Sequence, residues 1–159
     1  MAATLSHDVS GPQSTDAPAV VLLGSLGSDR SIWDAQVRDL ARDHTVITAD
    51  HRGHGGSEVI PGPCTIADLA RDLLSLTDAL GVDRFHVAGL SLGGALAQWL
   101  AVHEPTRVRS ATLLCTAAKF GESSGWVERA AAVRGGGTAA VADAVVARWI
   151  TPARAEQDP

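Results

Sequence analysis

The sequence predicts an α/β protein whose sheet is mainly parallel. Short apolar or β-branched runs at 19–23, 45–49, 84–90 and 108–115 alternate with segments of helical periodicity. The run at 19–23 contains no polar residue, which is the pattern of a strand buried on both faces. Strands separated by helices of ten to fifteen residues require right-handed crossovers, which cover both faces of a parallel sheet with helices.

The elements follow one another regularly along the chain. The first 18 residues are polar, and they form either a leader or a weak edge strand within 4–9. The elements expected after them are a strand at 19–23, a helix at 31–42, a strand at 45–49, a helix at 66–80, a strand at 84–90, a helix at 92–103, a buried strand at 108–115 and helical segments at 124–134 and 138–150. The last nine residues have no core-forming pattern.

One helix has signals at both of its ends. Thr65 is followed three residues later by Asp68, which predicts an N-cap with an acidic first turn. Gly81 comes directly after the apolar stripe and predicts the end of the helix. The helix that follows the loop at 50–64 is therefore expected to begin at residue 66.

Composition and charge exclude several classes of protein. The net charge is -5 and Lys119 is the only lysine, so there is no basic stripe for nucleic acid. No basic residue precedes Arg30 and no run of 18 apolar residues occurs, so we expect neither a secretory signal nor a membrane span, and a cytoplasmic location. Cys64 and Cys115 are isolated from each other and from metal-ligand spacings, so we expect free thiols, no metal and no cofactor.

A G-x-S-x-G pentapeptide lies between a predicted strand and a predicted helix. Gly89, Ser91 and Gly93 match a nucleophile elbow, in which the serine takes a strained turn and glycines permit close approach of the helix. The N-terminus of the helix adds partial positive charge beside the serine. The alternative is a glycine-rich turn in which Ser91 is only an N-cap.

Two loops at the ends of other strands complete the candidate site. The loop at 24–27 offers the backbone N–H of Leu26, which together with the N–H of Leu92 would bind a developing oxyanion. The loop at 50–57 contains His51 and His54, but glycine-rich loops with Asp and Arg more often hold themselves together by turn and ion-pair contacts. We therefore assign neither histidine a catalytic role.

The stretches VVLLGSLG, DHRGHGGS and GLSLGG resemble the α/β-hydrolase superfamily in order and approximate spacing, over about residues 5–150. Within it, GSLGSDRSIWD, GLSLGGALAQWLA and LLCTAAKFG look most like 3-oxoadipate enol-lactonases. The resemblance implies a sheet of the α/β-hydrolase type, with Ser91 as nucleophile and Leu26 and Leu92 as oxyanion donors. It also implies a core at 19–116 and the start of a helical cap within 117–159.

The resemblance also implies a catalytic acid and a catalytic histidine after later strands. The only histidine after Ser91 is His103, which is about 18 Å away along the helix axis and suits the helix C-terminus. The acidic residues of the expected cap belong on its surface; they are Glu122, Glu128 and Asp143. The triad is therefore incomplete, and the chain reads as truncated after the start of the cap.

Three functions stay open. The first is a serine-dependent hydrolase of a small enol-lactone, for which the cap offers Arg129, Arg134 and Arg148 to a dianionic product without singling one out. The second is a broader carboxylesterase. The third is an inactive fragment or interaction module, motivated by the absent base. An unpaired strand at the edge of the sheet predicts self-association in each case.

Overall fold

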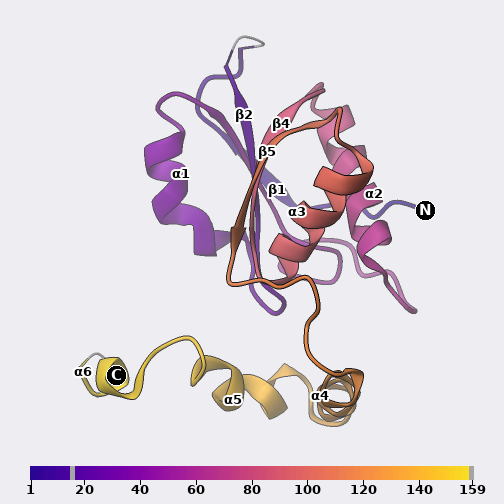
Figure 1. The fold of residues 1–159 in the computed structure, drawn as a ribbon, viewed down its shortest axis with the longest axis vertical. Helices are drawn as coiled ribbons and strands as arrows, with labels where there is room; N and C mark the ends of the chain where they lie inside the picture. The colour runs from indigo at the N-terminus through magenta and orange to yellow at the C-terminus, as the bar shows by residue number, and fades with distance from the viewer. Residues whose placement is uncertain (15–16, 158–159) are drawn as a thin grey trace. The chain divides into compact units, whose positions relative to one another are not determined.

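The computed structural model describes residues 1–14 and 17–157 and confirms the α/β architecture, with one sheet between helices (Figure 1). Positions 15 and 16 of the expected leader and 158 and 159 of the tail lie outside the described residues. The elements are β1 (His7–Ser10), β2 (Ala19–Leu23), η1 (Arg30–Trp33), α1 (Asp34–Leu40), β3 (Thr45–Ala49), α2 (Ile66–Ala79), β4 (Phe85–Leu90), α3 (Leu92–His103), β5 (Val108–Leu114), α4 (Ser123–Gly136), η2 (Thr138–Val141), α5 (Ala142–Val146) and α6 (Pro152–Gln157).

The sheet has the strand order β1-β3-β2-β4-β5. The pairs β2–β3, β2–β4 and β4–β5 are parallel, whereas β1 runs antiparallel to β3. Leu23, at the end of β2, is in register with Ala49 of β3 and with Gly89 of β4. Because parallel strands end at the same edge of a sheet, the loops that follow β2, β3 and β4 begin side by side.

The central strands β2 and β3 are buried on both faces, and the sheet has α1 on one side and α2 and α3 on the other (Figure 1). Alternate residues of β2 point to opposite faces of the sheet and belong to two separate hydrophobic cores. Val21 and Leu23 pack with α2 and α3. Val20 and Leu22 pack on the other face with Trp33 and α1. This two-sided burial explains why the run at 19–23 contains no polar residue.

The expected signals at the ends of α2 are confirmed. The Asp68 N–H donates to Thr65 Oγ1 at 3.2 Å, and the Thr65 N–H donates to Asp68 Oδ2 at 2.8 Å. This reciprocal pair satisfies two amides that have no partner within the helix. Gly81 follows the helix with φ +69°, the left-handed conformation that glycine adopts without steric cost.

The burial predicted for the strand at 108–115 is wrong. Strand β5 forms, but all of its residues after Val108 are exposed, and the side chains of Leu113 and Leu114 are 47% and 36% exposed. Strand β5 is last in the strand order, and among the residues that the structure describes it pairs along one side only, with β4. Its position at the end of the strand order leaves this strand exposed, and Arg109, Ser110 and Thr112 within it are polar residues that tolerate exposure.

Residues Lys119–Pro159 form a compact unit separate from Met1–Ala118. Helix α4 forms as expected, but the single helix expected at 138–150 is instead the 3₁₀ turn η2 followed by the short α5, and the tail contributes the short α6. None of these elements contains a buried residue. Helix α4 has no buried residue either and still forms, so exposure alone does not explain why the stretch at 138–150 is interrupted.

Candidate functional site

Ser91 lies at the junction between β4 and α3 in a strained backbone conformation. Its φ is +54° and its ψ is -107°, in a region that non-glycine residues rarely adopt. The end of β5 holds it in place, because the Ser91 N–H donates to the Leu114 carbonyl at 2.9 Å and the Thr116 hydroxyl donates to the Ser91 carbonyl at 2.9 Å. A strained turn secured on both sides is the geometry expected of a nucleophile elbow.

The side chain of Ser91 does not cap the helix. Ser91 occupies the N-cap position of α3, but its hydroxyl makes no cap hydrogen bond. The residue is half-buried, so its hydroxyl is neither sealed in the core nor committed to the helix. The geometry therefore disfavours the interpretation of Ser91 as an N-cap.

Two glycines let α3 approach the strands closely. A Cβ on Gly89 would lie 2.1 Å from the Gly93 carbonyl oxygen, and a Cβ on Gly93 would lie 2.3 Å from the Leu23 carbonyl oxygen. Both contacts are with backbone, which cannot swing away as a side chain does. Glycine at these two positions is therefore a packing requirement of the junction.

The loop after β2 adjoins the junction. The Gly93 N–H donates to the Gly24 carbonyl at 3.1 Å, which ties the first turn of α3 to the start of this loop. Leu26 lies half-buried in the following turn. Leu92 is the first residue of α3, where backbone N–H groups have no acceptor within the helix. The structure thus brings Ser91, Leu92 and the Leu26 loop to one edge of the sheet.

Asp50 is the first residue after β3, and its carboxylate anchors the loop at 50–57. Its buried carboxylate accepts hydrogen bonds from the Arg30 N–H at 2.7 Å, the Arg30 guanidinium at 2.7 Å and the Gly56 N–H at 3.0 Å. Three donors from two loops satisfy a charge that would otherwise be costly to bury. Asp50 therefore joins the loop after β3 to the segment that begins η1.

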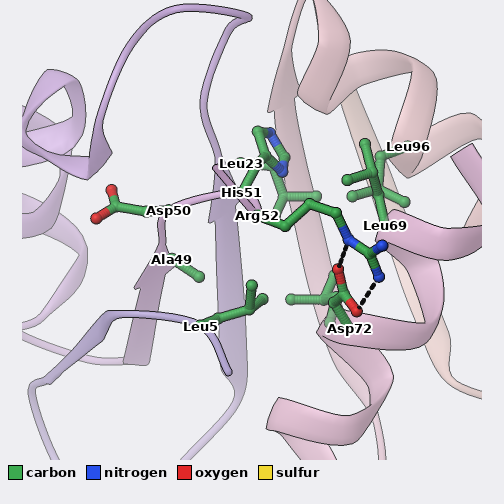
Figure 2. Close-up of a pocket in the computed structure, with 10 residues that line it drawn as sticks. Leu5, Leu23, Ala49, Asp50, His51, Arg52, Leu69, Asp72 and Leu96 are labelled. Carbon is green, nitrogen blue, oxygen red and sulfur yellow. Dashed lines mark hydrogen bonds and ion pairs between the residues drawn. The ribbon is translucent and has the colours of Figure 1, made fainter. Parts of the chain in front are cut away.

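Arg52 ties the same loop to α2. Its Nε and Nη2 lie 2.6 Å from Oδ2 and Oδ1 of the buried Asp72, a bidentate pair, and Asp72 Oδ1 also accepts the Ala3 N–H at 2.7 Å. Figure 2 shows Asp50 and Arg52 pointing to opposite sides of the loop. Ion pairs are present as expected for a loop with Asp and Arg, but they join the loop to η1 and α2, whereas the contacts within the loop are hydrogen bonds such as that from the Gly56 N–H to Asp50.

His51 and His54 both bind backbone groups of the loop after β2. His51 Nε2 lies 3.0 Å from the Gly24 carbonyl oxygen, and His54 Nε2 accepts the Gly27 N–H at 3.0 Å. His51 is buried, and burial lowers its pKa below the usual value for histidine. The sequence predicts contacts only within the loop at 50–57, because pairing with the neighbouring loop depends on strand order.

His103 lies at the end of α3 opposite Ser91, and the acidic residues considered as members of a triad belong to the second unit. His103 Nδ1 lies 2.9 Å from the Trp99 carbonyl oxygen, and its ring stacks on that of Trp99 with centroids 4.2 Å apart. His103 is thus engaged at the end of α3 opposite Ser91. The acidic residues singled out in the second unit are exposed there, as expected; they are Glu122, Glu128 and Asp143.

The second unit contains a hollow of about 460 Å³. Arg129 and Arg148 line it together with Phe120 and Trp126, and the Arg129 guanidinium lies 5.6 Å from the Trp126 ring centroid. Glu122 also lines the hollow, so its charged lining is mixed, with two guanidinium groups and one carboxylate.

Within residues 1–14 and 17–157, no group of three His, Cys, Asp or Glu side chains is placed to hold a metal ion. In the same described ranges, no helix has the length and apolar character needed to cross a membrane.

The sequence profile of the alpha/beta hydrolase fold family matches residues 18–147, and the chain belongs to that family. It is 39% identical over 148 residues to 3-oxoadipate enol-lactonase 1 of Acinetobacter baylyi, which covers 93% of this chain and 54% of the relative. The crystal structure of the enol-lactonase from Burkholderia xenovorans LB400 has a TM-score of 0.93 and 41% identity, and the match covers 98% of this chain and 60% of that one.

A thermophilic esterase from Thermogutta terrifontis, solved with malate bound, is also similar. Its TM-score is 0.80 at 31% identity, over 87% of this chain and 51% of the esterase. The chain therefore spans about half the length of the relatives it matches.

The burial of His51 predicts a pH-dependent stability. Below the ordinary histidine pKa of about 6.5, the unfolded chain gains a proton that folded His51, whose pKa is lowered, does not take up. The stabilisation that neutral His51 contributes is fully present above a pH of about 6.5. As the pH falls below this value, the free energy of unfolding should decrease by up to about 1.4 kcal/mol per pH unit. Urea unfolding from pH 7.5 to 5.5 measures the slope.

The variant His51→Gln should flatten this slope. Burial also lowers the pKa of the half-buried His86, so His86→Gln removes a further contribution of the same sign. Asp29 and Asp68, whose pKa values are lowered by hydrogen bonds to their side chains, titrate at lower pH and do not enter this window. An unchanged slope in His51→Gln would contradict the assignment.

Proposed function

We propose that this chain carries the nucleophile and the oxyanion donors of a serine-dependent hydrolase of small enol-lactones or esters. The observation that carries the proposal is the strained Ser91, whose hydroxyl is left uncommitted at the meeting point of the strand-end loops. Strain of this kind persists only where the surrounding contacts enforce it, and it is concentrated at functional sites.

In the proposed reaction, Ser91 Oγ attacks the carbonyl carbon of the lactone while its proton passes to a histidine base. The backbone N–H groups of Leu26 and Leu92 stabilise the oxyanion, assisted by the partial positive charge at the N-terminus of α3. Collapse of the tetrahedral intermediate releases the enol oxygen, which takes a proton, and the enol tautomerises to a ketone. Water then cleaves the acyl-serine. In this scheme the base and its acid are supplied by residues beyond those in this chain.

An enol-lactone is the favoured substrate class because the similar proteins of Acinetobacter baylyi and Burkholderia xenovorans are named as enol-lactonases, and they match more than nine-tenths of this chain. The esterase from Thermogutta terrifontis keeps a simple carboxylester as the alternative.

Turnover of two substrates by one extended enzyme tests the proposal. The chain is joined to the C-terminal part of an enol-lactonase that resembles it, and 3-oxoadipate enol-lactone is compared with a neutral aryl ester. A kcat/KM at least about 10-fold higher for the lactone supports the lactonase, since one charged contact accounts for such a ratio. The reverse preference supports the carboxylesterase, and no turnover of either substrate supports the inactive module.

We further propose that the isolated chain self-associates along β5. Within residues 1–14 and 17–157 no strand pairs with the outer side of β5, and Leu113 is 47% exposed. Sedimentation velocity should show a concentration-dependent rise in mass. Leu113→Lys should reduce this rise, because a charge on an edge strand opposes pairing, whereas Val102→Lys on the exposed part of α3 should not. A sharp monomer boundary at high concentration would contradict the proposal.

A further inference from the structure

The loop that carries Leu26 is held at both of its ends by histidines from the neighbouring loop. His51 Nε2 lies 3.0 Å from the Gly24 carbonyl oxygen, and His54 Nε2 lies 3.0 Å from the Gly27 nitrogen. The two rings meet edge to face, with centroids 5.9 Å apart. A pair of contacting side chains thus fixes both ends of a four-residue segment.

The backbone partners determine the tautomer of each ring. A carbonyl oxygen only accepts, so His51 carries its hydrogen on Nε2 and donates to Gly24. A backbone N–H only donates, so His54 Nε2 carries no hydrogen and accepts from Gly27. The hydrogen of His54 is then on Nδ1, which donates to the Arg52 carbonyl at 3.1 Å.

The two histidine contacts hold the backbone on either side of Leu26, the candidate oxyanion donor. The Gly24 carbonyl that accepts from His51 also accepts the Gly93 N–H at 3.1 Å, so one oxygen links the loop to the histidine and to the first turn of α3. Gly27 lies directly after Leu26, and it is exposed with a positive φ of +84°. Because glycine is conformationally permissive, an external contact is needed to fix the peptide beside it.

We propose that His54 is a positioning residue, which orients the Leu26 N–H toward the oxyanion by accepting the N–H of Gly27. This inference rests on the proposed function, which it deepens by naming what aligns the oxyanion hole. His51 supports it from the other end of the same segment. An oxyanion donor stabilises the transition state only when it is already oriented, so a contact that fixes the adjoining peptide acts on the reaction without touching the substrate.

Nuclear magnetic resonance on the full chain tests the contact directly. In ¹⁵N-labelled protein, a scalar coupling across the hydrogen bond should connect the Gly27 amide nitrogen with His54 Nε2. His54→Leu keeps an apolar side chain but removes the acceptor, and exchange of the Gly27 amide hydrogen should accelerate at least about 10-fold, the effect of losing about 1.4 kcal/mol of protection. His54→Gln, whose amide oxygen replaces Nε2 as acceptor, should restore the protection.

A transition-state analogue tests the positioning role. Phenylboronic acid adds to Ser91 Oγ with loss of one proton and forms a tetrahedral boronate whose oxygen stands in for the oxyanion. On adduct formation the Leu26 amide proton should move downfield in the unaltered chain and in His54→Gln. In His54→Leu this shift should be lost and the adduct should bind about 10-fold more weakly, less than the loss of a whole donor.

The outcomes separate this inference from the function on which it rests. Equal adduct affinity and an equal Leu26 shift in His54→Leu and the unaltered chain would overturn the positioning role while leaving Ser91 as nucleophile. Absence of the coupling to Gly27 would overturn it as well. If no adduct forms on the unaltered chain and Ser91→Ala behaves in the same way, the proposed function fails, and a surviving coupling then assigns His54 to loop structure alone.

Discussion

Replacing Ser91 by alanine abolishes enol-lactone opening by the extended enzyme, with an expected fall in kcat of at least about 10³-fold. The substitution removes the one atom that forms the covalent bond and leaves Leu26, Leu92 and the helix N-terminus in place. What remains is the rate that oxyanion stabilisation and binding supply without a nucleophile. Initial rates for the two forms, each checked for folding by circular dichroism, measure the effect.

Two further variants make this experiment specific. Ser75→Ala, on the exposed face of α2, should leave the rate unchanged. Ser91→Gly should be as inactive as Ser91→Ala but more stable by about 1 kcal/mol, because glycine adopts the positive φ of this junction without strain. Activity that survives in both Ser91 variants would remove the serine from the mechanism, and a destabilised Ser91→Gly would show that the junction is not strained.

The parts of the fold that the sequence predicts well are those whose signals are local. The two-sided burial of β2 is visible in five consecutive apolar residues, and the start of α2 is visible in Thr65 and Asp68. The junction at Ser91 is of the same kind, because its glycines, strand and helix are contiguous in the chain. Local signals suffice where the physical cause lies within a few residues.

The parts that the sequence does not predict depend on which strands become neighbours. The sequence of β5 was interpreted as a buried strand from its apolar residues, although Arg109, Ser110 and Thr112 within it already fit the edge position that the strand order gives it. The contact between His54 and Gly27 spans 27 residues and exists because β3 lies beside β2. The sequence shows the two histidines on either side of Arg52 and Gly53, but it does not show their backbone partners.

The second unit shows a different limit. An Ala- and Val-rich stretch at 138–150 favours helix by composition, yet it forms a 3₁₀ turn and a five-residue helix. Helix propensity is a weak prior, and a favourable composition does not determine where a helix is interrupted. The pocket beside Arg129 and Arg148 could not be predicted either, because helix-surface arginines are common and only their shared hollow distinguishes these two from Arg134.

The second large effect is expected at Gly93, where alanine should destabilise the chain by about 3 kcal/mol or more. The added Cβ would lie 2.3 Å from the Leu23 carbonyl oxygen and 2.8 Å from that of Gly24, so α3 must move away from β2. That movement breaks the hydrogen bond from the Gly93 N–H to Gly24 and separates Leu92 from the Leu26 loop. For a chain of this size, the midpoint of thermal unfolding should fall by at least about 6 °C.

Gly125 provides the matched control, because it also lies in a helix and a Cβ there would meet nothing within 4 Å. Gly125→Ala should leave the midpoint unchanged or raise it slightly, since alanine favours helix by about 1 kcal/mol. Gly89→Ala, whose Cβ would lie 2.1 Å from the Gly93 carbonyl oxygen, should behave like Gly93→Ala. If Gly93→Ala and Gly125→Ala unfold at the same temperature, close backbone approach does not fix the junction, and the strain at Ser91 must be maintained by Leu114 and Thr116 instead.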